Sequence, residues 1–60
     1  MELNVQFADA TEAVVISYFG APQGSTVYQN LGTLDSSDRR WKEYYEAQPT
    51  QNQQFLPVPD

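Results

Sequence analysis

The chain has 60 residues, a formal net charge of −5, and no cysteine or histidine. A domain of this size buries only about 60% of the surface that its unfolded chain would expose, so its core is small. Disulfide bonds and a structural zinc site built from cysteine and histidine are both excluded. We therefore expect one small domain that relies on helix–sheet packing, with oligomerisation as a further source of stability.

The basic side chains lie among acidic neighbours, which argues against a nucleic-acid partner. The three basic residues are Arg39, Arg40 and Lys42, and the same segment contains Asp35, Asp38, Glu43 and Glu46. A surface that binds phosphate normally carries a basic excess on one face. No apolar run approaches the ~20 residues that span a membrane, and residues 1–4 lack the pattern of a secretory signal. We expect a cytoplasmic protein without a nucleic-acid or membrane partner and, because it opens with Met1, a complete gene product.

Two apolar runs predict an antiparallel β-hairpin at the N-terminus. Residues 3–8 alternate between apolar and polar, residues 13–19 are rich in β-branched and aromatic side chains, and residues 9–12 join them. A four-residue loop buries the most apolar surface, because it places six large apolar side chains on one face. Its pairs are Phe7 with Val14, Val5 with Ile16, and Leu3 with Tyr18. A three-residue loop would put Ala13 and Ser17 on that face, so we expect the four-residue loop.

A hairpin alone is marginal in water, so further elements must cover it. Residues 26–29 are the candidate for a short third strand, a prediction that Asn30 and Gly32 weaken. The main cover is one helix with Asp35 as its expected N-cap and an end just before Pro49. One stripe of this helix has the spacing of a buried face and is mostly aromatic: Trp41, Tyr44, Tyr45 and Gln48.

The predicted fold class is α+β, with one domain at residues 1–48 and a flexible Pro/Gln-rich tail at residues 49–60. In the domain, the N-terminal antiparallel hairpin and any short third strand pack against the C-terminal α-helix. The tail is polar up to Gln54, whereas the prolines of residues 55–59 favour an extended, apolar path. Three roles stay open for residues 55–59: a ligand for an aromatic-lined groove, a strap over the face that carries Val15 and Phe19, or a frayed end.

The chain lacks the residues from which catalytic sites are usually built. Four serines have no histidine to activate them, and Lys42 on an exposed helix is a poor base: Ser17, Ser25, Ser36 and Ser37. Paired carboxylates would need a desolvating cleft, which a chain this short scarcely forms. Neither the glycine-punctuated calcium loop of an EF-hand nor a phosphate-binding glycine pattern occurs. We expect no enzyme activity, no cofactor and no metal site.

The predicted helix is the best candidate for partner recognition. Tryptophan, tyrosine and arginine are the residues most enriched at interface hot spots. The candidate partner contacts are therefore Arg39, Arg40, Trp41 and Tyr44. The competing interpretation, which we favour for the aromatic stripe, assigns these rings to the core and the basic side chains to solvent. Both hold together if Trp41 packs inward while Arg40 and Tyr44 meet a partner at the edge.

The hairpin also leaves a free β-edge, through which two copies could pair as a symmetric homodimer. The alternative is that polar side chains on this edge and the tail that covers it prevent pairing with another strand.

Three segments follow one another in a distinctive order: FGAPQ at residues 19–23, VYQNLG at 27–32 and DRRWKEYY at 38–45. This order resembles short uncharacterised proteins of tailed phages and prophages, often encoded near tail or tail-fibre genes, over residues 3–48. The resemblance implies an accessory or assembly role inside a bacterial host cell, and it assigns no residue a function.

The favoured function is therefore non-enzymatic protein–protein interaction by a small phage-type accessory or assembly protein. Two alternatives remain open. One is an acidic inhibitor or mimic that blocks a basic nucleic-acid-binding partner, since charge complementarity accelerates encounter. The other is a self-associating structural subunit.

Overall fold

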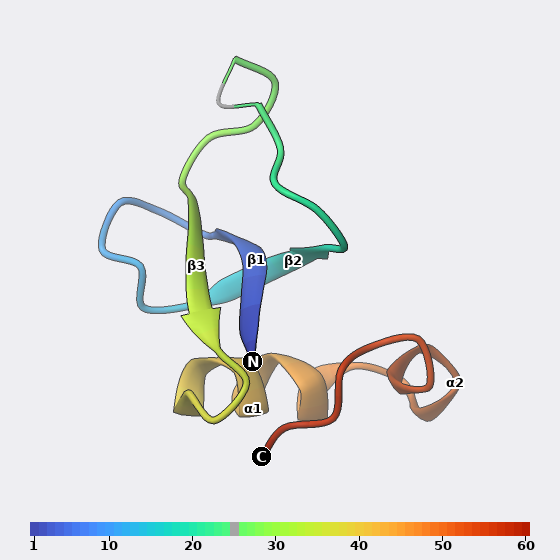
Figure 1. The fold of residues 1–60 in the computed structure, drawn as a ribbon. Coiled ribbons are helices and arrows are strands. Elements are labelled where there is room, and N and C mark those ends of the chain that lie inside the picture. The colour runs from blue at the N-terminus through green and yellow to red at the C-terminus, as the bar shows by residue number, and fades with distance from the viewer. Residues whose placement is uncertain (25) are drawn as a thin grey trace.

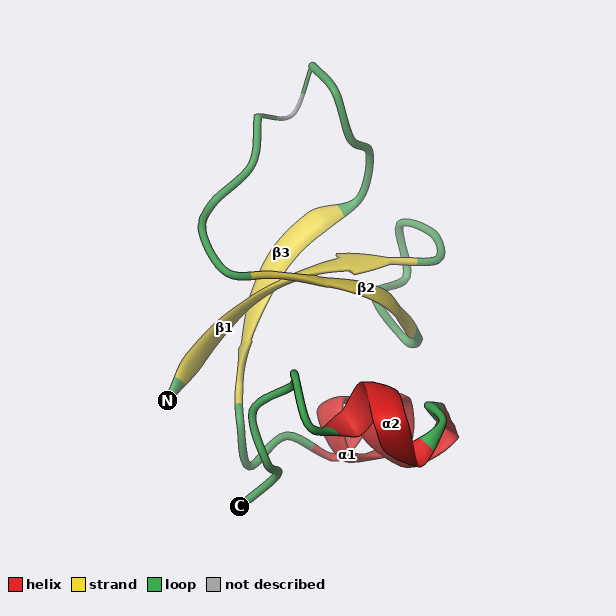
Figure 2. Cartoon of the chain, turned by 90° about the vertical axis from the view of Figure 1, so that its right-hand side faces the viewer, coloured by secondary structure: helices red, strands yellow, loops and turns green. Residues whose placement is uncertain are grey.

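The computed structural model describes residues 1–24 and 26–60, so Ser25 lies outside the described residues. The elements in chain order are β1 (Glu2–Phe7), β2 (Val15–Phe19), β3 (Leu31–Asp35), α1 (Arg39–Ala47) and α2 (Thr50–Gln53). The strands form one antiparallel sheet in the order β2-β1-β3. Both helices lie together below the sheet, and the connection from β2 to β3 projects from the opposite end (Figure 1 and Figure 2). The predicted α+β class is confirmed.

The central strand β1 supplies half of the core. Leu3, Val5 and Phe7 alternate with polar residues, so all three point to one face of the sheet, where they are buried. The other buried apolar side chains come from different elements: Val15, Leu34 and Trp41. The indole ring of Trp41 is 0% exposed and closes the core from the helix side. The interpretation of Trp41 as a core residue is therefore confirmed.

The predicted hairpin register is wrong, because β2 contains a β-bulge. The observed pairs are Asn4 with Phe19, Val5 with Tyr18, Gln6 with Ser17, and Phe7 with Val15. Ile16 has no partner in this pairing and is the additional residue of the bulge. The bulge lets Val15 and Tyr18 share a face although they are an odd number of residues apart. Val15 therefore enters the core in place of Val14.

The third strand is β3, whereas residues 26–29 are not a strand and contain a turn at residues 26 and 27. Asn30 precedes β3 with φ of 57°, a left-handed conformation that asparagine adopts more readily than most residues. Gly32 then leaves room for the ring of Phe7, because a Cβ at this position would lie 2.7 Å from Phe7 Cε2. Asn30 and Gly32, which weaken the prediction of a strand at residues 26–29, are thus the residues that let β3 pair with β1.

Asp38 caps α1, so the prediction of Asp35 as N-cap is wrong. An Asp38 carboxylate oxygen accepts a hydrogen bond from the Arg40 backbone N–H at 2.8 Å. Asp35 instead ends β3 and accepts a hydrogen bond from the Ser37 N–H at 2.9 Å. Both aspartates suit an N-cap, but pairing of β3 with β1 takes Asp35 into the sheet. The predicted end of the helix before Pro49 is confirmed.

Residues 49–60, predicted as a flexible tail, contain α2 and then return along α1 (Figure 1). Leu56 packs against the core. Several hydrogen bonds join this segment to the domain. They include one from Trp41 Nε1 to the Pro57 carbonyl at 3.0 Å and one from Ser36 Oγ to an Asp60 carboxylate oxygen at 2.6 Å. The segment thus contacts the helix side of the molecule. Phe19, which a strap formed by residues 55–59 would have covered, instead packs against Tyr28, with the two ring centroids 4.9 Å apart.

Candidate interaction groove

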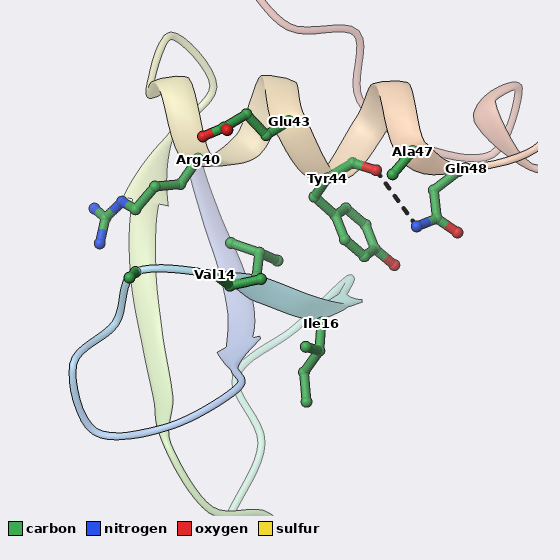
Figure 3. Close-up of a pocket in the computed structure, with 9 residues that line it drawn as sticks. Val14, Ile16, Arg40, Glu43, Tyr44, Ala47 and Gln48 are labelled. Carbon is green, nitrogen blue, oxygen red and sulfur yellow. Dashed lines mark hydrogen bonds between the residues drawn. The ribbon is translucent and has the colours of Figure 1, made fainter.

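An open groove lies between β2 and α1. It has a volume of about 360 Å³. Figure 3 shows the side chains around it, which come from β2, from α1 and from the residues next to them. Val14 and Ile16 lie on the strand side, and Arg40, Glu43, Tyr44, Ala47 and Gln48 lie on the helix side. Ala13 and Val15 complete the lining. The groove therefore has one wall from the sheet edge and one from the helix.

The strand wall carries two aliphatic side chains that the fold leaves in solvent. Val14 is 57% exposed and Ile16 is 49% exposed. The bulge explains both values, because it sends Val15 into the core between them. In Figure 3 the side chain of Ile16 points away from α1. Contiguous exposed apolar surface of this kind marks interaction sites more often than scattered apolar residues do.

The helix wall is built around the half-buried ring of Tyr44. This ring packs on Trp41 with a centroid distance of 5.4 Å. Burial raises the pKa of Tyr44, so its hydroxyl stays protonated at neutral pH. Ala47, one turn further along α1, is too small to fill the space beside this ring. Gln48 closes the end of the wall by donating a hydrogen bond from Nε2 to the Tyr44 carbonyl at 3.3 Å (Figure 3).

Arg40 joins three parts of the fold at the other end of the groove. Its Nε and Nη2 atoms donate to the two carboxylate oxygens of Asp38 at 3.0 and 2.9 Å. Its Nη1 atom donates to the Glu12 carbonyl at 2.6 Å, and its guanidinium lies 5.3 Å from the centroid of the Phe7 ring. The hydrogen bonds from Arg40 lower the pKa of Asp38. Arg40 therefore holds the β1–β2 loop against α1, and its charge is matched by Asp38.

Glu43 is the other charged side chain of the groove. Its nearest cation is Arg39, whose Nε atom lies 4.0 Å from a Glu43 carboxylate oxygen. Both side chains are mostly exposed, and a pair of this kind contributes only about 0.3–0.5 kcal/mol. Glu43 therefore keeps most of its hydration and is only weakly paired.

The strand that borders the groove is an edge strand. Within the described part of the chain, the sheet order leaves the outer side of β2 without a neighbouring strand. The residues of β2, Val15–Phe19, include no charged side chain and no proline, which are two of the usual means of blocking an edge. The bulge at Ile16 interrupts regular pairing beside the groove, whereas Ser17 to Phe19 keep the regular pattern.

The structure separates the four candidate contacts that the sequence grouped together. Arg40 and Tyr44 line the groove. Trp41 is fully buried and offers no surface to a partner, which corrects its place in that group. Arg39 is exposed and does not line the groove. The helix therefore contributes only part of its predicted contact surface.

Seven groove residues were not among the predicted contacts: Ala13, Val14, Val15, Ile16, Glu43, Ala47 and Gln48. The sequence assigned Val14 and Ile16 to the core because an uninterrupted strand would place them there. No signal in the sequence distinguishes this bulge from a regular strand. Ala47 could have been noticed as the one small residue beside the aromatic stripe of the helix.

No protein-family model, curated protein or solved structure matches this chain. Among residues 1–24 and 26–60, no helix is both long and apolar enough to cross a membrane. Over the same residues, the structure brings together no group of three or more Asp, Glu, His or Cys side chains that could hold a metal ion.

Proposed function

We propose that this protein acts by binding another protein through the groove between β2 and α1. The observation that carries the proposal is that the exposed residues Val14 and Ile16 line the same groove as the half-buried ring of Tyr44. Partners commonly bury such aliphatic and aromatic side chains at the centre of an interface. The function is therefore non-enzymatic, and its contact residues are Val14, Ile16, Tyr44 and Ala47, with Arg40 and Glu43 at the rim.

The groove suits one or a few side chains better than a whole domain. Its volume of about 360 Å³ lies at the lower end of the range for sites that enclose a small ligand. The rigid elements on its two sides also favour recognition, because little order must be imposed when a partner binds. The resemblance to short phage and prophage proteins supports an accessory or assembly role for the interaction.

Self-association is the second candidate, and the uncharged edge of β2 favours it. An edge with no charged residue can pair with a second copy of itself without bringing like charges together along the strand. This candidate uses the same exposed residues as the first, so the oligomeric state distinguishes the two.

Selection from a displayed library of random peptides tests the proposed surface. We expect the immobilised protein to retain peptides whose binding is lost in the Val14→Ser variant. The matched control is Val27→Ser, because Val27 is 74% exposed and lies in the distant connection between β2 and β3. Peptides that bind both variants equally, or no enriched peptide at all, would refute the groove as the interaction surface.

A further inference from the structure

We infer that the occupant of the groove is an extended, basic segment of a different protein, with aliphatic side chains that alternate with lysine or arginine. This inference rests on the proposed function and specifies the partner that the same groove binds.

The geometry of the strand wall favours an extended occupant. β2 lies at the edge of the sheet, and alternate backbone N–H and C=O groups of an edge strand face outward. Ser17 to Phe19 keep the regular pairing geometry, so they offer these groups to an added strand. An added strand that starts there continues beside Ile16 and Val14 into the groove. Its alternate side chains then point toward Tyr44 and Ala47 on the helix wall.

The lining of the groove favours aliphatic side chains in that occupant. Val14, Ile16 and Ala47 are apolar and line the groove together with the Tyr44 ring. The Ile16 side chain points away from α1 (Figure 3), so the space beside the ring is bordered by Val14 and Ala47. No described residue fills the space between them. An aliphatic side chain there would remove apolar surface on both molecules from water.

The charge distribution favours a basic occupant. The chain has eight acidic and only three basic side chains, so its net charge of −5 attracts a basic segment. The three basic side chains lie on α1, where acidic side chains of the same segment offset them. Of the two charged side chains in the groove lining, Arg40 is already matched by Asp38 at 2.9 Å. Glu43 has only the weak pair with Arg39, so it is the free charge at the rim. A lysine or arginine beside the docked aliphatic residue would lie within reach of Glu43.

The same charges disfavour a second copy as the occupant. Two copies would each bring a net charge of −5, whereas a basic segment is attracted from a distance. The β2 segment of a second copy carries no cation to meet Glu43. The bulge at Ile16 also breaks the regular edge where two copies of β2 would have to pair.

Three synthetic peptides of equal length test the inference. They are the capped heptapeptides Lys-Val-Lys-Ile-Lys-Val-Lys, Gln-Val-Gln-Ile-Gln-Val-Gln and Glu-Val-Glu-Ile-Glu-Val-Glu, titrated into the isotope-labelled protein and followed by the backbone amide signals of residues 14–19 and 43–48. At low salt we expect the lysine peptide to bind at least about tenfold more tightly than the glutamate peptide. The difference should shrink at about 0.5 M salt, where exposed charges are screened.

Matched variants separate the role of Glu43 from that of net charge. Glu43→Gln should lower the affinity for the lysine peptide by about threefold to tenfold. The control Glu2→Gln removes the same charge at the exposed start of β1, and it should change this affinity less than twofold. Equal binding of the three peptides, or no binding of any up to about 2 mM, would overturn the inference. A dimer in sedimentation that Val14→Ser dissociates would overturn it as well, in favour of a second copy. If the library yields groove-dependent peptides that are not basic, the proposed function stands and only this inference fails.

Discussion

Replacing Gly32 with alanine tests whether the packing between β3 and Phe7 supports the fold. Gly32 has no positive φ, so alanine meets no backbone strain there. Its Cβ would instead lie 2.7 Å from Phe7 Cε2, below any normal carbon–carbon contact. Phe7 is fully buried between the strands and Arg40, so its ring has little room to move. The substitution therefore overpacks the core.

The expected loss in free energy of unfolding is about 1–2 kcal/mol. Overpacking a core costs about 1–3 kcal/mol, and the reduced freedom of the unfolded chain on Gly→Ala returns about 0.4–1 kcal/mol. A core of this size supplies about 3–5 kcal/mol in total, so the loss removes a large share of the stability. Since a 60–100-residue domain loses roughly 4–8 °C per kcal/mol, the melting temperature should fall by about 5–15 °C.

Urea unfolding followed by circular dichroism measures this effect. With a slope of about 1 kcal/mol/M, the midpoint should fall by about 1–2 M for Gly32→Ala. Gly20→Ala is the matched control, because a Cβ at Gly20 meets no atom within 4 Å. Phe7→Leu should reduce the cost of Gly32→Ala by at least about 0.5 kcal/mol, since the two residues share one contact. If the free energy of unfolding of Gly32→Ala lies within about 0.5 kcal/mol of that of the unmodified protein, the Phe7 ring does not need the space beside Gly32.

Three further predictions concern the helix start, the C-terminal segment and pH. Asp38→Ala should lower the free energy of unfolding by about 0.5–2 kcal/mol through loss of the helix cap, whereas Glu46→Ala on the same helix should change urea stability by less than about 0.5 kcal/mol. Removal of residues 55–60 should shift the fluorescence of Trp41 to longer wavelength and increase its quenching by iodide, because Pro57 and Leu56 then no longer cover the indole. An unchanged spectrum would show that this segment does not shield the ring. Hydrogen bonds from Ser37 and Arg40 lower the pKa values of Asp35 and Asp38. Folding stability should therefore be nearly constant from about pH 5 to about pH 6 and fall as the pH drops through about 4, where the unfolded carboxylates take up protons first. Thermal melts from pH 6 to pH 2 measure this loss, and Asp38→Asn should reduce it.

The sequence by itself determined the elements that depend on local chemistry. Alternation in residues 3–7 was enough to place β1 and its buried face, because side chains in a strand point to opposite sides in turn. Pro49 was enough to end α1, because the residue before proline is driven out of helical geometry. The aromatic spacing predicted that Trp41 and Tyr44 face the core, whereas the other two members of the stripe, Tyr45 and Gln48, lie outside the core cluster. The α+β class follows from these features together.

The tertiary structure decided everything that depends on competition between partners. Both Asp35 and Asp38 can cap a helix, and only the pairing of β3 with β1 settles that Asp38 does so. Gly32 weakens an isolated strand, yet the ring of Phe7 requires it in this sheet. The bulge at Ile16 places Val15 in the core instead of Val14, and it thereby creates the exposed wall of the groove. Loop length and hydrophobic pattern could not reveal this exchange, because Val14, Val15 and Ile16 are all suited to burial and only the fit against Phe7 and Trp41 chooses among them.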